Sequence, residues 1–385
     1  MTEPARQDMR RLRVVHIALH FAEYAAHLAR AMARQAEVML ILYRCNADNE
    51  LGGDWQTYFE GPNLKTLVLD RPRNAVAIVQ NTKRLLDAIK TFDPSLIHYQ
   101  EDIRDELALS MPFLAAYPKV LTVHDPQPHS GRDANRLRFS RLRLYRFWMR
   151  RAIDAAITHG QKLAIDLTQQ CPWLFGKVAT IAHGPLGLRD ALPASGVSTD
   201  MRLLFFGRIH QYKGLASFID AVISLRGEGL PVIGVVAGKG SDLERHREAM
   251  ARSAGFEILD HYIPAQDVPR LFNQSRVVVL PYIDGTQSGV AALALGHGRP
   301  VIATAVGSIP ELVRHGQNGL LVAPGNTEEL KSAIRSVLVD DELWATLQRG
   351  AITLRDGELS WQAICDKTLA VYASAISGHA IRDKG

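Results

Sequence analysis

The sequence predicts an α/β protein with two doubly wound, Rossmann-like parallel-sheet domains facing across a cleft. Three observations lead to this prediction: a length of 385 residues, short apolar runs that alternate with helix-length amphipathic segments, and an aperiodic stretch near the middle of the chain. A chain of this length usually forms two domains, each able to bury its own core. Continuously apolar strands alternating with helices are typical of parallel sheets covered on both faces.

Six short apolar runs in the first half of the chain predict strands, because they are rich in Val, Ile and Leu and too short for helices. These runs are residues 13–18, 37–43, 65–69, 95–99, 119–124 and 177–182. Helical segments are expected between them at 22–35, 74–91 and 103–116. The alternation predicts one parallel sheet for this half.

The second half repeats the pattern, with strands predicted at 202–206, 231–237, 277–282, 300–304 and 319–323. The stretch 188–201 contains Pro, Ser, Gly and Thr without periodicity, which predicts a linker between domains 1–190 and 191–359. The last segment, 360–377, is expected to form a helix that packs back onto the first domain. Ligands of such folds bind at the carboxyl ends of the strands, so the cleft between the domains is the expected site.

The composition is that of an ordinary globular protein, with 47% hydrophobic and 22% charged residues. No apolar run approaches eighteen residues, so no transmembrane helix is expected. The N-terminal apolar run is short and lacks a cleavage site, which argues against a signal peptide. Cys45, Cys171 and Cys365 are scattered, and free thiols in a reducing cytoplasm are the expected state.

Positive charge is concentrated in the first half of the chain. Residues 1–153 hold 23 Lys and Arg against 17 Asp and Glu, a net of +6, whereas the remainder holds 22 against 23, a net of −1. Segment 132–153 alone has eight Arg and one Asp. The asymmetry predicts an anionic partner for this half, with a membrane surface favoured over nucleic acid.

At 100° per residue the segment 132–153 predicts a helix with an outward arginine stripe. Leu137, Leu144, Trp148 and Ala152 fall on the opposite face and are expected to pack on the sheet. The side chains predicted to dock on an anionic membrane surface are Arg136, Phe139, Arg143, Arg146, Phe147 and Arg150. A solvated face with extended arginines, or an RNA-binding patch, is the alternative.

The stretch "GRIHQYKGLASF", residues 207–218, follows an apolar strand and leads into a helix. The first N–H groups of a helix lack intrahelical partners, and the helix dipole is positive at that end. Arg208 and Lys213 could neutralise two phosphates there, and Gly207 and Gly214 would let the backbone approach closely. The stretch therefore predicts a phosphate site. The alternative is a plain strand–turn–helix with two solvated cations.

An ordered series of motifs extends through both halves of the chain. The second half contains "LLFFGRIHQYKGL", "VVAGKGSDL", "VVVLPY", "GHGRPVIATAVGSIPELVRHGQNGLLVAPGNTEEL" and "SWQAI", and the first half contains "DPSLIHYQE", "VLTVHDP" and "KVATIAHGPLG". Over residues 12–376 their order and spacing resemble the group 1 (family 4) class of retaining glycosyltransferases with the GT-B fold. The resemblance implies that 1–190 is an acceptor-side domain and that 191–359 binds a nucleotide sugar.

The resemblance also implies an activity: transfer of a hexose-type sugar, with retention, from a nucleoside-diphosphate donor. The implied acceptor is a saccharide or polyprenyl-linked saccharide, in bacterial-type polysaccharide or glycolipid assembly on the cytoplasmic membrane. Arg208 and Lys213 would hold the donor diphosphate, and His124, at the end of a strand, would face the transferred sugar. Because the sequence has no Asp-x-Asp motif, no metal cofactor is expected. His124 could instead satisfy loop backbone groups, and His159 and His183 are weaker candidates.

The sequence departs from this family at the usual pair of glutamates, where Gly285 and Leu293 stand instead. The loop that replaces the pair supplies N–H and O–H groups near a helix N-terminus, so it is predicted to bind the donor. Its candidate residues are Asp284, Thr286, Gln287, Ser288 and Gly289, to which Glu311 is added. Thr286 or Ser288 could also cap the helix, and Glu311 could merely complement a helix dipole.

Two other functions stay open at this level. Loss of the glutamate pair is compatible with an inactive glycosyltransferase-like partner subunit, and the same fold also supports sugar-nucleotide epimerases. Retention of Arg208, Lys213 and His124 favours an active transferase. No side chain stands out as a covalent nucleophile, so the sequence does not decide between front-side attack and double displacement.

Overall fold

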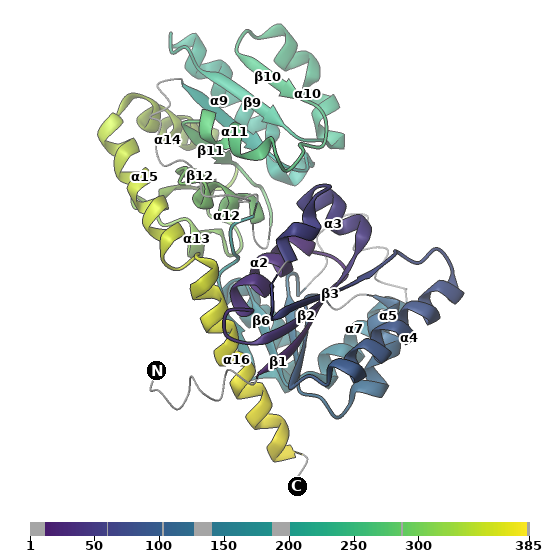
Figure 1. The fold of residues 1–385 in the computed structure, drawn as a ribbon. Helices are drawn as coiled ribbons and strands as arrows, with labels where there is room; N and C mark the ends of the chain where they lie inside the picture. The colour runs from purple at the N-terminus through teal and green to yellow at the C-terminus, as the bar shows by residue number, and fades with distance from the viewer. Residues whose placement is uncertain are drawn as a thin grey trace. The chain divides into compact units, whose positions relative to one another are not determined.

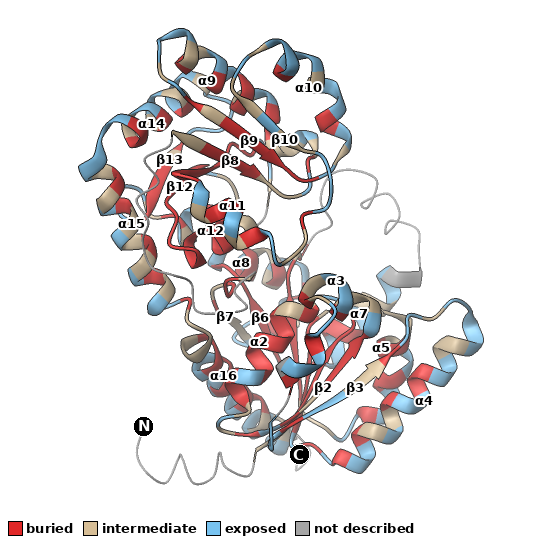
Figure 2. Ribbon diagram, turned by 45° about the horizontal axis from the view of Figure 1, so that its top comes forward, coloured by how far each residue is buried: buried red, intermediate tan, exposed pale blue. Residues whose placement is uncertain are grey.

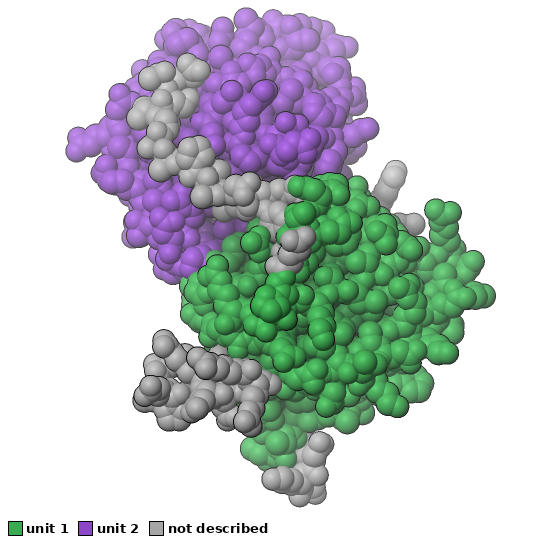
Figure 3. Space-filling model, viewed as in Figure 1, with its two compact units in different colours: residues 1–182, 361–385 green, residues 183–360 purple. Residues whose placement is uncertain are grey.

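The chain divides into two compact units, Met1–Ala182 with Trp361–Gly385, and His183–Ser360 (Figure 3). This computed structural model describes residues 12–59, 61–101, 104–126, 141–186, 201–285 and 288–382. The unit boundary falls after Ala182, whereas the sequence placed it after residue 190, which lies outside the described residues. The C-terminal helix is assigned to the first unit.

Seven parallel strands form the sheet of the first unit (Figure 1). They are β1 (Arg13–Ala18), β2 (Glu37–Tyr43), β3 (Leu64–Leu69), β4 (Leu96–Tyr99), β5 (Lys119–Val123), β6 (Ala155–Thr158) and β7 (Val178–Thr180). Their spatial order is β3-β2-β1-β4-β5-β6-β7, so the direction of winding reverses between β1 and β4. In doubly wound folds this reversal creates a crevice at the carboxyl ends of the strands.

Helices pack on both faces of this sheet (Figure 1). They are α2 (Ala22–Met32), α3 (Arg44–Leu51), α4 (Ala75–Phe92), α5 (Asp105–Ser110), α7 (Arg141–Ala152), α8 (Gln161–Gln170) and α16 (Trp361–Arg382). Helix α4 begins at the N-cap Asn74, whose side chain accepts a hydrogen bond from the N–H of Ala77. Helix α16 packs against α2, where the ring of Trp361 stacks on His27 at 5.1 Å.

The second unit has a six-stranded parallel sheet with the same relative order. Its strands are β8 (Arg202–Phe206), β9 (Ile233–Ala237), β10 (Phe256–Leu259), β11 (Val277–Leu280), β12 (Val301–Thr304) and β13 (Gly319–Val322). Its helices are α9 (Leu215–Gly227), α10 (Ser241–Arg252), α11 (Val268–Gln274), α12 (Gly289–Gly296), α13 (Ile309–Leu312), α14 (Thr327–Val339) and α15 (Asp341–Asp356). The spatial order β10-β9-β8-β11-β12-β13 reverses between β8 and β11.

The predicted α/β fold class and both parallel sheets are confirmed, but two strands were missed. β6 has the sequence AAIT, with one large aliphatic residue, and Glu257 interrupts the apolar run of β10, FEIL. The predicted helix 103–116 is shorter than expected, because α5 ends at Ser110 and a 3₁₀ turn, Met111–Leu114, follows at a proline. Among the described residues no helix is long and apolar enough to cross a bilayer.

The inner strands form the buried centre of each unit, whereas the edge strands β3, β7 and β10 are partly exposed (Figure 2). The strand interiors of the first unit include polar side chains: His16, His98, Gln100 and Thr158 are fully buried beside the aliphatic core. Burial of a polar group costs free energy unless it is hydrogen-bonded, so these side chains require partners inside the sheet. The hydroxyl of Thr158 donates to the carbonyl of Gly160 at 3.2 Å, and His98 lies between the hydroxyls of Tyr372 and Thr122.

Candidate active site

Two glycines bring the loops after β8 and β11 together, at the point where the winding of the second sheet reverses. Gly207 directly follows β8 with a φ of 106°, and its N–H donates to the carbonyl of Ala237 at 2.9 Å. Gly214 has a φ of 73°, and a Cβ there would lie only 1.9 Å from the carbonyl oxygen of Pro281. Because a side chain would be strained and would clash, only glycine fits before α9.

Lys213 lies at the end of the short turn Gln211–Lys213, next to the N-terminus of α9. Its Nζ donates to the hydroxyl of Tyr282 at 2.6 Å and lies 4.1 Å from the centre of that ring. Burial lowers the pKa of Lys213 from 10.5 to about 8; the charge of Tyr212 opposes this shift, and that of Arg208 adds to it. The ammonium group is therefore held where its charge lacks full solvation.

Arg208 is exposed, and its positive charge acts on Lys213. Two cations placed near each other repel, and a dianion bound to both would remove that repulsion. The first N–H groups of α9, a helix of 13 residues, lack intrahelical acceptors and add positive potential. This end of the second sheet has the chemistry of a site for a diphosphate.

Ser288 is the N-cap of α12, and its Oγ accepts a hydrogen bond from the N–H of Ala291 at 3.2 Å. The same Oγ lies 3.2 Å from the hydroxyl of Tyr282, so Tyr282 connects Ser288 to Lys213. Asp284 is exposed and accepts from the N–H of Gly285 at 2.7 Å. Ser288 thus has the predicted capping role, and it also contacts Tyr282, whose hydroxyl accepts the hydrogen bond from Lys213.

The other predicted donor-binding residues are less informative. Thr286 and Gln287 lie outside the described residues. Gly289 is the first residue of α12, and Glu311 is exposed in the first turn of α13, a helix of four residues. Leu293, where a glutamate is usual, is buried in α12 with 7% of its surface exposed.

His124 directly follows β5 in the first unit and is buried, with 6% of its surface exposed. Its Nε2 lies 3.0 Å from the amide nitrogen of Gln100, the residue after β4. The imidazole stacks on the ring of Phe21 at 3.8 Å, with an angle of 16° between the planes. His124 therefore lies at the carboxyl edge of the first sheet, where the sequence predicted it.

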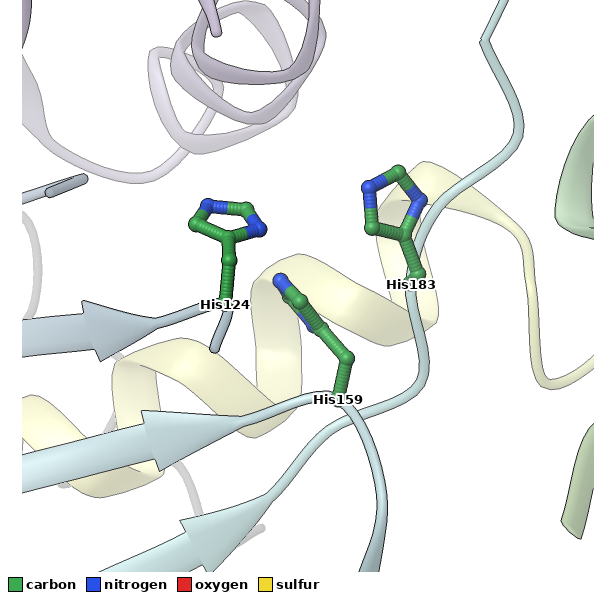
Figure 4. A group of neighbouring side chains, drawn as sticks. All are labelled: His124, His159 and His183. Carbon is green, nitrogen blue, oxygen red and sulfur yellow. The ribbon is translucent and has the colours of Figure 1, made fainter. Parts of the chain in front are cut away.

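Three histidines, His124, His159 and His183, form a cluster (Figure 4). His159 Nδ1 lies 3.0 Å from the carbonyl oxygen of Ile181, and His183 Nδ1 lies 2.7 Å from that of Gly184. His183 directly follows Ala182 at the unit boundary, so the backbone after β7 places it there. One nitrogen from each ring lies within 4.8 Å of the others, so three imidazoles, a ligand type that metal ions accept, are gathered here.

The predicted orientation of α7 is wrong. Leu144 and Trp148, expected to pack on the sheet, are 57% and 60% exposed, and Ala152 is exposed as well. Arg150, predicted to dock on a membrane, is instead only 3% exposed, and its guanidinium donates to the carbonyl of Pro126 at 3.3 Å. The buried face is formed by Met149 and Ile153.

The remaining residues of the predicted docking surface divide into three groups. Arg143 and Phe147 are exposed, as expected, and Arg146 is half-buried. Arg136 and Phe139 lie outside the described residues. The exposed surface of α7 thus differs from the predicted arginine stripe: apolar Leu144, Phe147 and Trp148 lie beside Arg143 and Arg151.

Sequence reasoning missed three residues near these sites: Tyr282, Gln100 and His16. Tyr282 ends the motif "VVVLPY", and its hydroxyl contacts both Lys213 and Ser288. His16 interrupts the apolar strand β1, and Gln100 directly follows the apolar strand β4; a polar side chain at such a position needs a hydrogen-bond partner. The sequence shows these polar residues, but it does not show which side chain on a neighbouring strand is the partner.

Comparisons with known proteins find relatives for both halves of the chain. A family model described as "Glycosyl transferases group 1" matches residues 200–340, and one described as "Glycosyltransferase Family 4" matches residues 22–184. Glycogen synthase of Mycobacterium tuberculosis (strain ATCC 25618 / H37Rv) is 25% identical over 302 residues, covering 75% of this chain and 71% of that protein.

A D-inositol 3-phosphate glycosyltransferase of Saccharomonospora viridis is 32% identical over 199 residues, which cover 49% of this chain and 46% of that protein. Among solved structures, HepE of Anabaena in complex with UDP and glucose matches with a TM-score of 0.69 and 19% identity, covering 94% of this chain and 100% of that one. Sucrose-phosphate synthase of Thermosynechococcus elongatus matches with a TM-score of 0.71 and 17% identity, covering 95% and 100%.

Proposed function

The chain belongs to the glycosyltransferases of group 1 and family 4 and has the GT-B fold, and from this premise we propose a specific reaction. The enzyme transfers a hexose-type sugar from a nucleoside-diphosphate donor to a saccharide or lipid-linked saccharide, with retention of configuration. Arg208 and Lys213 hold the diphosphate. The observation that carries this proposal is the pair of cations beside the N-terminus of α9, at the winding reversal of the second sheet.

The relatives support a nucleotide-sugar donor. The Anabaena HepE protein was crystallised with UDP and with UDP-glucose, and a starch synthase of Arabidopsis thaliana was crystallised with ADP and acarbose. Each shares the fold with this chain. A diphosphate is the part common to UDP and ADP, and it is the group that two cations and a helix N-terminus recognise.

The cations act on the leaving group. When the bond between the anomeric carbon and the diphosphate oxygen breaks, negative charge grows on the diphosphate. Fixed positive charges stabilise that state more than the ground state, so Arg208 and Lys213 lower the barrier. We therefore propose that the reaction needs no metal ion. His124 contacts the transferred sugar from the first domain.

Alanine substitution tests the diphosphate site. Arg208→Ala and Lys213→Ala should each weaken binding of UDP or ADP about tenfold or more, because a charge-assisted contact contributes about 1.5–3 kcal/mol. Arg252→Ala and Lys331→Ala are matched controls, since Arg252 pairs with Glu248 within α10 and Lys331 pairs with Glu328 within α14, both away from the loop after β8. Calorimetric titration should show unchanged affinity in both controls.

The inactive-partner alternative makes the opposite prediction, and it draws support from Leu293, which offers no carboxylate to a donor. Under that alternative no nucleoside diphosphate binds the wild-type chain, and Arg208→Ala has no effect. If Arg208→Ala and Lys213→Ala both bind the nucleotide with unchanged affinity, the nucleotide lies elsewhere and the proposed site is contradicted.

We also propose that α7 docks on an anionic membrane surface, through its exposed apolar residues and not through the arginine stripe expected from the sequence. Leu144, Phe147 and Trp148 are 57%, 47% and 60% exposed, and Arg143 and Arg151 lie exposed on the same helix. Exposed aromatic side chains flanked by cations suit the headgroup region of an anionic bilayer. A lipid-linked acceptor would be reached from such a position.

A further inference from the structure

A line of polar side chains crosses the buried sheet of the first unit. His16 lies on β1, Gln100 directly follows β4 and His124 directly follows β5, and these three strands are neighbours in the sheet. The Nε2 atom of His16 lies 2.9 Å from Oε1 of Gln100, and the amide nitrogen of Gln100 lies 3.0 Å from Nε2 of His124. One glutamine amide therefore bridges two imidazoles.

We propose that Gln100 is a positioning residue that fixes the tautomer of His124. An amide group donates from its nitrogen and accepts at its oxygen. Because the nitrogen of Gln100 donates to Nε2 of His124, that atom must carry a lone pair, and the ring proton is on Nδ1. The N–H of His124 then lies at Nδ1, the nitrogen nearer His159, where the ring is a hydrogen-bond donor and not a base (Figure 4).

His16 sets the direction of the amide. Among the described residues its Nδ1 is buried without a hydrogen-bond partner. If the oxygen of Gln100 faces His16, then Nε2 of His16 carries the proton and the unpartnered Nδ1 is a lone pair. The reverse orientation would bury an unpartnered N–H, and buried orphan N–H groups are rarer in proteins than under-satisfied acceptors.

The His16 ring is itself held in place. It stacks on His98 with ring centres 4.5 Å apart and planes within 1° of parallel. His98 is fixed by Tyr372, 2.6 Å from its Nδ1, and by Thr122, 2.8 Å from its Nε2. Burial lowers the pKa of His16 to about 4, so its ring stays neutral at physiological pH. The backbone of Gln100 is anchored too, because its N–H donates to the carbonyl of Ile17 at 2.9 Å.

The test reads the tautomer directly by long-range proton–nitrogen NMR of protein labelled with ¹⁵N-histidine, in the absence of substrate. The His124 signals are identified by their loss in His124→Gln. The wild-type pattern is expected to show the proton on Nδ1. In Gln100→Glu the carboxylate only accepts, so we expect the proton to move to Nε2 or the ring to become doubly protonated.

Thr82→Val is the matched control, because it removes a buried hydroxyl of the same unit that donates to the carbonyl of Ile78 within α4, outside the contacts that join His98, His16, Gln100 and His124. It should destabilise the fold but keep the proton of His124 on Nδ1. A wild-type proton on Nε2 would overturn the proposal. An unchanged tautomer in folded Gln100→Glu would overturn it as well. If Gln100→Glu does not fold, the position of the His124 proton in the wild-type spectrum alone confirms or overturns the proposal.

The catalytic consequence rests on the proposed transferase function and is measured separately. Gln100→Glu should lower kcat at least tenfold with little change in KM for the donor, since a fixed ring in the wrong tautomer loses transition-state contacts, not substrate binding. Thr82→Val should keep a kcat near that of the wild type. If the spectrum is as expected but no transfer occurs with any donor, the proposed function fails and the tautomer assignment stands.

Discussion

The ammonium group of Lys213 contacts the hydroxyl and the ring face of Tyr282, and Arg208 adds a second positive charge nearby. Burial is the main reason why the pKa of Lys213 falls to about 8. An anionic ligand favours the protonated form of a neighbouring lysine, so binding a diphosphate should raise that pKa. Proton uptake and nucleotide binding are therefore coupled at this residue.

The coupling predicts a pH dependence for nucleotide affinity. The protonated form of Lys213 binds the diphosphate, so the affinity for the nucleotide is highest well below pH 8 and falls as the pH rises through that value. Between pH 7 and pH 9 the dissociation constant should rise about tenfold, which is the change in the protonated fraction of a group titrating near pH 8. Lys213→Arg keeps its charge and should flatten the profile. An equal slope in both proteins, measured by calorimetry, would exclude Lys213 as the titrating group.

Leu293 predicts weak discrimination at the ribose of the donor. A glutamate could accept hydrogen bonds from both ribose hydroxyls, whereas buried Leu293 accepts none. Removing a hydroxyl costs much where a buried partner is left unpaired and little where there is none. The ratio of kcat/KM for a donor and its 2′-deoxy analogue should therefore stay below about tenfold, or 1.4 kcal/mol. A larger ratio of kcat/KM would mean that another residue forms hydrogen bonds with the ribose hydroxyls.

The sequence predicts the positions of some of these residues correctly and misses the roles of others. Gly207 and Gly214 were predicted because their spacing around a strand end is local, and the clash at Pro281 explains Gly214. His124 was placed correctly after its strand. Gln100 was missed because its role depends on neighbours 84 and 24 positions away along the chain. Such contacts follow from strand order, which one sequence does not display.

At the scale of elements, α7 shows why helical periodicity alone can misplace a face. The prediction placed the arginines, together with Phe139 and Phe147, on the outward face and Leu144 and Trp148 on the face that packs on the sheet. Arg150 instead satisfies carbonyl groups inside the unit, including that of Pro126, while Trp148 is exposed. Regular strands were predicted well, because a continuous apolar run needs no knowledge of the partner. The short strands β6 and β10 lack such a run.

The corrected face of α7 predicts binding to anionic vesicles that weakens as salt rises. The double variant Phe147→Ala, Trp148→Ala should reduce sedimentation with phosphatidylglycerol-containing vesicles tenfold or more, since each buried aromatic contributes about 1.5–3 kcal/mol. Tyr262→Ala is the control, because Tyr262 is 68% exposed in the other unit. Equal binding to neutral vesicles, or none to either, would leave α7 an ordinary solvated helix.

On the scale of the whole molecule, both units repeat one winding order, and each places candidate residues directly after the carboxyl ends of its strands. Gly207 follows β8 and Tyr282 closely follows β11 in one unit, while Gln100 follows β4 in the other. The sequence predicted this plan because strand and helix periodicities are strong over a whole chain. Placement of the binding chemistry at the reversal follows from the fold itself.

Metal independence is a property of the whole reaction and can be tested on it. The cations Arg208 and Lys213 are proposed to do the work of a divalent ion on the diphosphate. The transfer rate should therefore change less than about twofold when EDTA is added and divalent cations are removed. A strict requirement for Mg²⁺ or Mn²⁺ would contradict this part of the account.

Calorimetric titration of the wild-type protein with matched nucleosides and nucleoside diphosphates tests the central claim most directly. If the second unit is built around a diphosphate site, UDP, ADP or GDP should bind, and the corresponding nucleoside should bind at least tenfold more weakly, because two charge-assisted contacts are lost. Equal affinity for a nucleoside and its diphosphate, or no binding of any nucleoside diphosphate, would contradict the claim that Arg208 and Lys213 hold the donor.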